Sequence, residues 1–135
     1  FVLMLPLVIR WRGSADLLVK ILPAIAVMVV GFLVLAWSPT LMLFVMALLV
    51  FFVGFNYLEA TLPALVSKVA PSARRGSAMG VYSSSQFLGI FAGGSVGGVL
   101  IGLTDITTLL VVNAALLILW AGLLMALQRG SNQPK

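Results

Sequence analysis

The stretch of sequence that decides the fold is residues 41–67, which read LMLFVMALLVFFVGFNYLEATLPALVS. Its single charged residue is Glu59. The hydrocarbon core of a bilayer is about 30 Å thick and requires roughly 20 consecutive, mostly apolar residues of helix. A strand of a membrane barrel would instead alternate apolar and polar residues over about 10 positions, and this stretch does not. It therefore predicts a helix that spans a membrane.

Apolar runs of comparable length lie on both sides of this stretch. We expect complete spans at about 21–37, 41–67, 78–103 and 106–127, preceded by residues 1–9 as the partial tail of a fifth span. The predicted fold class is all-α, a polytopic transmembrane helical bundle that occupies residues 1–129. Residues 130–135 are polar and are predicted to form a cytoplasmic tail.

The composition supports a membrane protein and excludes several classes of function. Of the 135 residues, 62% are hydrophobic and 8% are charged, whereas soluble domains have about 45–50% apolar and about 25% charged residues. Cysteine and histidine are both absent, which excludes disulfides, Cys/His zinc sites and imidazole catalysis. No catalytic, metal-binding or phosphate-binding motif is present either. We therefore expect neither an enzyme nor a bound cofactor.

The basic residues predict the orientation in the membrane. All eight lie before span 21–37, between spans 41–67 and 78–103, or after the last span: Arg10, Arg12, Lys20, Lys68, Arg74, Arg75, Arg129 and Lys135. The other two connections, residues 38–40 and 104–105, contain none. Basic connections stay on the cytoplasmic side, so we predict a multi-pass protein of the inner (plasma) membrane with a cytoplasmic C-terminus. The net charge of +5 is then a topology signal and does not indicate nucleic-acid binding.

Glu59 is the first candidate for a functional residue. An ionisable residue inside a membrane span is costly and is expected to face the protein interior or a water-filled cavity. There it can exchange a proton or hold a cationic ligand. Asn56 and Pro63 lie on the same helix face, and Pro63 cannot donate a hydrogen bond to the carbonyl of Glu59. A structural role, in which Glu59 only stabilises a kink at Pro63, stays open.

A second polar group opens span 78–103. Tyr82 and Gln86 lie at a depth similar to that of Glu59, share a helix face with Gly89, and can line the same cavity. Buried polar groups in lipid need partners, so Tyr82 and Gln86 are cavity candidates. Asn113 is a weaker candidate, expected to form hydrogen bonds between helices.

The same span carries two rows of glycines spaced four residues apart. One row is Gly89, Gly93 and Gly97, and the other is Gly94, Gly98 and Gly102. Such spacing lets helix backbones approach closely in lipid. The rows predict either static helix packing or a surface that slides during a conformational change.

Residues 55–63, the basic connection at 74–77 and residues 78–98 together resemble the C-terminal half of a Major Facilitator Superfamily transporter. The resemblance is strongest to the YajR-like branch of proton-driven efflux proteins. It implies that the chain provides the eighth to twelfth helices of a twelve-helix fold with two six-helix halves, a central cavity and alternating access. The glycine rows resemble the antiporter motif of that fold's fifth helix. The partners implied are the lipid bilayer, the missing N-terminal half and an unknown small-molecule substrate, with a proton gradient as energy source.

Three functions are compatible with these features. The leading hypothesis is a fragment of a secondary active transporter that exports small molecules by proton coupling. A complete four-helix multidrug transporter acting as a dimer is the first alternative, although its charge bias should be weak and here it is one-sided. The second alternative is a non-transporting membrane subunit that offers span 78–103 as a docking helix.

Overall fold

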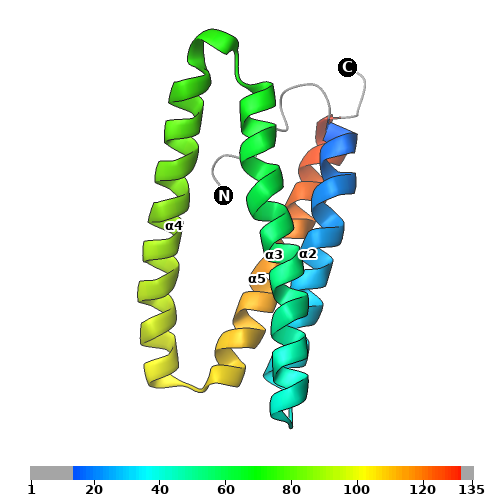
Figure 1. Cartoon of the computed structure of the whole chain (residues 1–135), viewed down its shortest axis with the longest axis vertical. Helices are drawn as coiled ribbons and strands as arrows, with labels where there is room; N and C mark the ends of the chain where they lie inside the picture. Colours follow the sequence, from blue (N-terminus) through cyan, green and yellow to red (C-terminus); the bar gives the residue numbers. More distant parts are fainter. Residues whose placement is uncertain (1–13, 132–135) are drawn as a thin grey trace.

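The computed structural model describes residues 14–131, which form four long helices (Figure 1). These are α2 (Ser14–Ala36), α3 (Leu41–Val69), α4 (Arg75–Leu103) and α5 (Ile106–Ser131), with a 3-10 turn η1 (Ser72–Arg74) before α4. All four are long and apolar enough to cross a membrane. The predicted all-α membrane bundle is therefore confirmed for the described residues, and the expected partial span at residues 1–9 lies outside them.

All four helices extend beyond the apolar spans at the end that carries the basic residues, and α3 does so by two residues, to Val69. Helix α2 begins at Ser14 where the predicted span begins at residue 21, and α4 begins at Arg75 where the span begins at residue 78. Helix α5 continues through Gly130 to Ser131, into the stretch expected to be a tail. Apolar composition defines the part of a helix that lies in lipid, but hydrogen bonding continues into the interface, where polar side chains are tolerated.

Local sequence explains where α3 begins and ends. The Thr40 hydroxyl accepts a hydrogen bond from the Leu43 amide at 3.3 Å, which caps the first turn. At the other end, Ala70 adopts an extended conformation immediately before Pro71. A residue before proline is disfavoured in the helical region, so the chain leaves α3 there.

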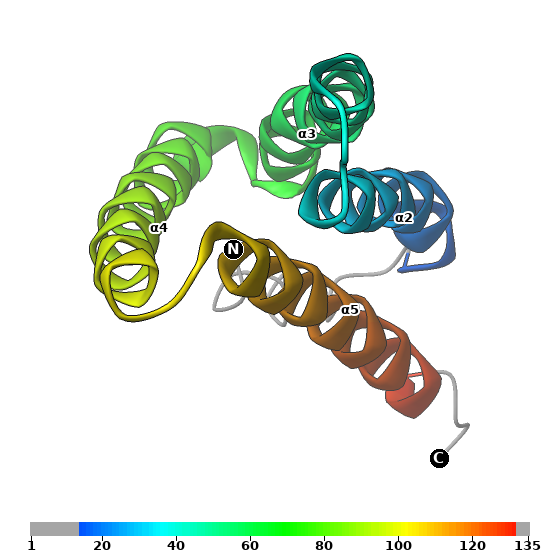
Figure 2. The ribbon, with the colours of Figure 1, turned by 90° about the horizontal axis from the view of Figure 1, so that it is seen from below.

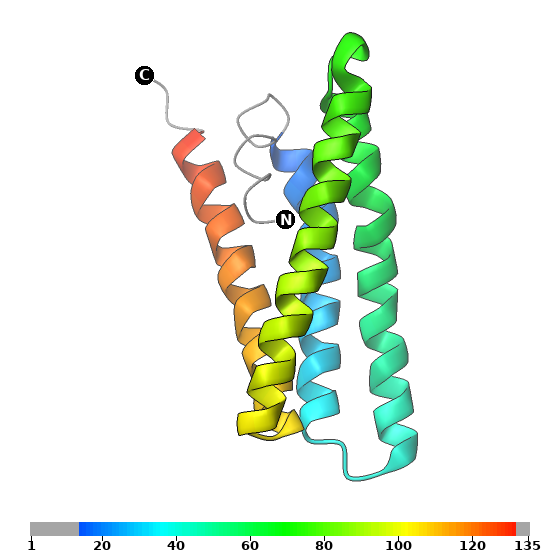
Figure 3. The same ribbon diagram turned by 90° about the vertical axis from the view of Figure 1, so that its left-hand side faces the viewer.

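The helices alternate in direction, and this places the basic residues together. The start of α2, the end of α5 and the connection from α3 to α4 lie at one end of the bundle (Figures 1 and 3). Lys68, Arg74 and Arg75 belong to that end, as does Lys20 in the first part of α2. The connection that contains Asp105 lies at the opposite end. Among the described residues, the basic side chains are therefore segregated to one end.

Helix α2 is the centre of the packing. It lies between α3 and α5, whereas α4 stands on the side away from α2 (Figure 2). The side chains of Ile21 and Ile25 in α2 and of Leu124 in α5 are almost completely buried. Helix α4 contributes one buried residue to this core, Tyr82. The large apolar side chains on the outer faces, such as Phe91 of α4, are exposed as expected of surfaces that meet lipid.

Two glycines allow α2 and α3 to approach closely. A Cβ atom added at Gly31 would lie 2.8 Å from the Cβ and 2.9 Å from the Cα of Phe51. A Cβ added at Gly54 would lie 2.6 Å from the carbonyl oxygen of Ala24 and 2.7 Å from Cγ of Met28. All four distances are shorter than the contact distances that carbon and oxygen atoms tolerate, so this interface requires glycine at both positions.

Asp105 caps the start of α5. Its carboxylate accepts a hydrogen bond from the Thr108 amide at 2.7 Å. Hydrogen bonds from the Thr108 side chain and then from its amide lower the pKa of Asp105. Because the pKa of Asp105 is lower in the folded state, its ionised carboxylate stabilises the fold at pH values above the pKa of the unfolded chain. This contribution is lost as the pH falls through the pKa of the folded state.

Asp105→Ala should therefore lower the melting temperature of the full-length protein by a few degrees at neutral pH, because one capping acceptor is lost. Asp105→Asn is the matched control, since asparagine caps as well as aspartate but does not titrate. It should retain most of the stability and lose only the dependence on acid pH. A melting temperature unchanged in Asp105→Ala would contradict the capping role.

Candidate functional site

Glu59 of α3 and Gln86 of α4 are joined by a hydrogen bond. The Gln86 amide nitrogen Nε2 donates to Oε1 of Glu59 at 2.5 Å. Helices α3 and α4 are antiparallel neighbours joined by a short connection (Figure 1), so residues at equal depth face each other. The structure thus brings together two of the residues that the sequence analysis placed at one level. This bond ties α4 to α3 within the membrane span.

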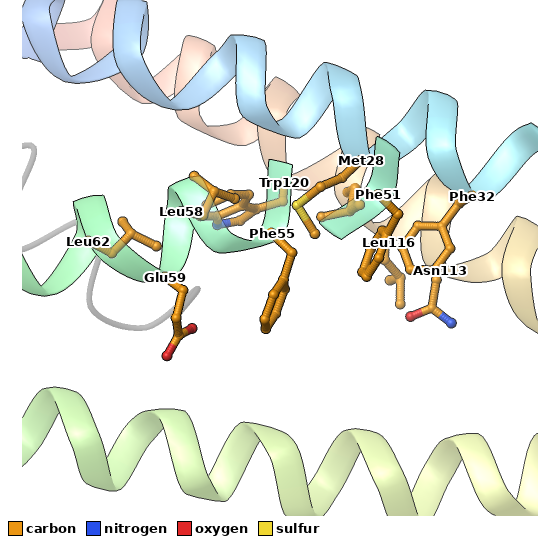
Figure 4. A pocket seen from close by; sticks show the side chains of 11 residues that line it. Met28, Phe32, Phe51, Phe55, Leu58, Glu59, Leu62, Asn113, Leu116 and Trp120 are labelled. Carbon is orange, nitrogen blue, oxygen red and sulfur yellow. The ribbon is translucent and has the colours of Figure 1, made fainter. Parts of the chain in front are cut away.

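Glu59 also lines a pocket on the side of the bundle that faces α4 (Figure 4). The pocket has a volume of about 360 Å³ and is formed by α2, α3 and α5. Its lining is mostly apolar and rich in aromatic rings: Met28, Phe32, Phe51, Phe55, Leu58, Glu59, Leu62, Asn113, Leu116, Leu117 and Trp120. Small-molecule sites in proteins have this character, an apolar cavity with a few polar groups.

The aromatic part of the lining is a continuous group of rings. The ring centroids of Phe32 and Phe51 are 4.6 Å apart, and those of Phe51 and Phe55 are 5.9 Å apart. These separations are typical of favourable aromatic pairs. Phe51, Phe55 and Glu59 are spaced four residues apart on α3 and so lie on one helix face. The face of α3 that presents the acid therefore also presents the rings.

Asn56 and Pro63 were expected on the helix face of Glu59, and Tyr82 and Gln86 were expected to line the same cavity, but none of the four lines this pocket. The Asn56 side chain donates to the carbonyl oxygen of Phe52 in its own helix at 2.9 Å. Pro63 is half-buried within α3, which continues through it to Val69. Tyr82 is buried in the core formed with α2, α3 and α5.

Asn113 lines the pocket although it was the weaker candidate. Its side-chain nitrogen donates to the carbonyl oxygen of Leu109, one turn earlier in α5, at 2.8 Å. This nitrogen therefore bonds within α5, in place of the expected hydrogen bond to another helix. A polar side chain in lipid can bond to its own helix backbone instead.

The glycine rows of α4 face open space in the described part of the chain. A Cβ added at Gly89, Gly93, Gly94, Gly98 or Gly102 would meet no atom within 4 Å, and one added at Gly97 would lie 3.8 Å from Leu109 Cδ1. Close helix packing within the described residues uses Gly31 and Gly54 instead. Any close packing of the α4 rows would have to involve residues outside the described ones.

The sequence analysis did not identify the aromatic lining. Phe51 and Phe55 carried a usable signal, because both repeat at four-residue spacing toward Glu59. Phe32 and Trp120 carried none, since they come from helices whose packing partners a single sequence does not specify. Among the described residues, no group of three or more His, Cys, Asp or Glu side chains is placed to hold a metal ion.

Comparisons with known proteins also indicate a membrane transporter. The sequence model of the Major Facilitator Superfamily matches residues 17–135. The inner membrane transport protein YajR of Escherichia coli K12 is 50% identical over 70 residues, which cover 52% of this chain and 15% of YajR. An uncharacterized transporter of Buchnera aphidicola subsp. Baizongia pistaciae is 38% identical over 76 residues, which cover 56% of this chain and 19% of that protein. No solved structure matches the chain significantly.

The matched segments span less than a fifth of the length of these two relatives. The family match, in contrast, covers most of the chain and includes all of α3, α4 and α5. Three findings are consistent with a membrane transporter: the four long apolar helices, the pocket between three of them, and the similarity to membrane transport proteins. None of these findings indicates an enzyme. The chain belongs to the Major Facilitator Superfamily of membrane transporters.

Proposed function

We propose that the chain is the C-terminal part of a secondary active transporter that exports small molecules by proton coupling and alternating access. The observation that carries the proposal is Glu59, a carboxylate inside a membrane-spanning helix that lines a pocket and is held by Gln86. Intramembrane acids are expensive and mark proton relays and substrate paths in transporters. The match to a small part of longer transporters favours this function over a complete four-helix transporter acting as a dimer.

The open face of α4 supports alternating access. Its glycines meet nothing within the described chain apart from the distant contact of Gly97, so a helix from the N-terminal half can pack on this face. In such folds one half moves against the other around a central site. We propose that the glycine rows take part in this movement, and that Asn56, Pro63 and Tyr82 support the helices around Glu59.

The test of the proposal is transport by the full-length protein in liposomes. With an imposed proton gradient, uptake or release of a panel of candidate compounds should follow the gradient and stop when it is collapsed. Proton movement should accompany compound movement in the opposite direction. Transport that ignores the gradient would contradict proton coupling, and the absence of any transport would favour a non-transporting subunit.

We further propose that the basic end of the bundle faces the cytoplasm of the cell and that the protein lies in the inner (plasma) membrane. Cysteines placed at Ser72 and at Thr104 lie at opposite ends of α4. An impermeant thiol reagent added outside should label the Thr104 site only, because basic connections stay inside. The native residues of this chain include no cysteine, so they add no background.

A cysteine at Val53 is the matched control. Val53 is exposed on the outer face of α3, near the middle of the span, and should react from neither side. Labelling of the Ser72 and Thr104 sites from the same side would contradict the predicted topology.

A further inference from the structure

We propose that the connection between α3 and α4 binds the phosphate of an anionic phospholipid. The site is the α3–α4 turn, defined here as residues 68–75, and its cations are Lys68, Arg74 and Arg75. The turn lies at the end of the bundle away from Asp105 (Figure 1). The proposal needs only that the helices span a membrane. It is independent of proton coupling, of the transported compound and of the leaflet that the turn meets.

The lengths of α3 and α4 place the turn at the level of the lipid headgroups. Each helix contains 29 residues, which gives a length of about 44 Å at 1.5 Å per residue. The hydrocarbon core is about 30 Å thick, and the bilayer including its headgroup regions is about 40–45 Å thick. The ends of both helices therefore extend past the core, into the layer that contains the lipid phosphates.

Hydrogen bonds hold the turn in a compact shape. The Ala70 amide donates to the carbonyl oxygen of Val66 at 3.0 Å, and the Arg74 amide donates to that of Pro71 at 2.9 Å. The second bond lies in the 3-10 turn η1, from which α4 continues directly. A turn that is already ordered loses little conformational entropy when it binds a ligand. Its cations are therefore better placed to bind than the same charges on a flexible chain.

The cations of the turn are not neutralised within the described chain. Lys68, Arg74 and Arg75 are all exposed. Within the described residues, none of the three forms an ion pair. The first turn of α4 contains no acidic residue. The turn therefore presents three positive charges that lack a negative partner in this part of the protein.

The acidic residues of the chain lie elsewhere. Glu59 is inside the membrane span, where it accepts the hydrogen bond from Gln86. Asp105 is at the opposite end of α4, where it caps α5. The third acid, Asp16, belongs to the start of α2, a helix that packs against α3 and α5. The charge of the turn is thus left for a partner that the membrane supplies.

An anionic phospholipid has the chemistry that fits this turn. Its phosphate is a negative group at the depth of the turn, and guanidinium groups bind phosphate oxygens through paired hydrogen bonds. The approach to α4 is open at Gly76, where an added Cβ would meet no atom within 4 Å. A phosphatidylcholine also carries a phosphate, but its choline cation cancels the charge. Basic residues at a membrane surface accordingly attract the anionic lipids.

The experiment is native mass spectrometry of the full-length protein in detergent, titrated with phosphatidylglycerol or with phosphatidylcholine of the same acyl chains. We expect phosphatidylglycerol to bind at least about tenfold more tightly, because its net negative charge meets uncompensated cations. Added salt should reduce this preference, since exposed charges are screened. Inorganic phosphate at the same concentration should not displace the lipid, because it lacks the acyl chains that keep the headgroup beside the turn.

Variants then assign one bound lipid to the turn. Arg74→Gln/Arg75→Gln should weaken the binding of one phosphatidylglycerol at least about tenfold, since each cation near the surface contributes about fivefold. Arg74→Lys/Arg75→Lys should restore most of the affinity, because both charges are kept. Lys20→Gln is the matched control. It removes a positive charge from α2 at the same end of the bundle and should bind as the unmodified protein does.

Equal affinity for the two lipids would overturn the proposal, and so would a double glutamine variant that keeps every tightly bound phosphatidylglycerol. A loss in Lys20→Gln as large as in the double variant would show a diffuse field over the whole basic end and would contradict a site at the turn. Displacement by inorganic phosphate would show that the turn binds the free anion instead. Melting temperatures show whether each variant is folded. If the double glutamine variant is not, Lys68→Gln takes its place, with an expected loss of about fivefold.

Discussion

Glu59→Gln is expected to abolish proton-driven transport by the full-length protein while leaving its folding near normal. Glutamine keeps the shape of the side chain but cannot exchange a proton. Its amide oxygen can still accept the hydrogen bond that Gln86 donates to Glu59, so the link between α3 and α4 survives. Replacing a carboxylate by a neutral amide in a membrane span also lowers the cost of placing the helix in lipid. The measurement is gradient-driven transport in liposomes across a range of pH, with expression and melting temperature measured alongside.

The matched control for this variant is Glu59→Asp. Aspartate keeps a titratable group on the same helix face, one methylene further from Gln86, and should retain part of the transport activity and its dependence on pH. Transport by Glu59→Gln with an unchanged dependence on pH would show that Glu59 only stabilises the helix around Pro63.

Gly31→Leu is expected to cause the largest loss of stability. Its Cβ alone would lie within 3 Å of Cα, Cβ and the amide nitrogen of Phe51, and backbone atoms inside a helix cannot move aside individually. Helices α2 and α3 would have to separate, which also disturbs the core around Ile25 and Met28. Overpacking typically costs about 1–3 kcal/mol and occasionally more, and here we expect the upper part of that range, measured as thermal stability in detergent.

Gly122→Leu in α5 is the matched control, because a Cβ there would meet no atom within 4 Å in the described chain. It should leave the melting temperature nearly unchanged. If the melting temperature falls by a similar amount in both variants, the close approach of α2 and α3 at Gly31 does not explain the loss of stability.

The closeness of Glu59 and Gln86 could be predicted because it depends on local chain geometry. Two helices joined by a short connection run antiparallel, so depth in one corresponds to depth in the other. Both residues are polar within apolar spans, and such groups seek partners. Nothing about the rest of the protein is needed for that argument. The four apolar helices were predictable for a similar reason, since the bilayer sets their length.

The packing of the glycines could not be predicted in the same way. The rows at Gly89 and Gly93 are conspicuous in sequence, yet they meet no other helix in the described chain. Gly31 and Gly54 belong to no four-residue repeat, yet a Cβ added at either would lie within 3 Å of the facing helix. A repeat shows that a helix has a smooth face, but the partner of that face is set by the tertiary arrangement.

The pocket was missed for the related reason that it draws on three helices. Phe32 of α2, Phe51 of α3 and Trp120 of α5 converge only once α2 has packed between α3 and α5.

Polar residues also gave ambiguous signals. Asn56 and Asn113 satisfy their side-chain nitrogens on carbonyls of their own helices, and sequence alone does not distinguish this from a bond between helices.

The position of α2 between α3 and α5 has a consequence for biogenesis. Helices enter the membrane in the order of synthesis, so α2 and α3 can associate as a hairpin as soon as both are inserted. The side of α2 that receives Leu124 of α5 stays uncovered until α5 leaves the ribosome. Helix α4 is made in between and contributes little to closing this three-helix unit. Folding of this three-helix unit therefore waits for α5, and a nascent chain stalled after α4 would leave the α5-facing side of α2 open to lipid or to chaperones.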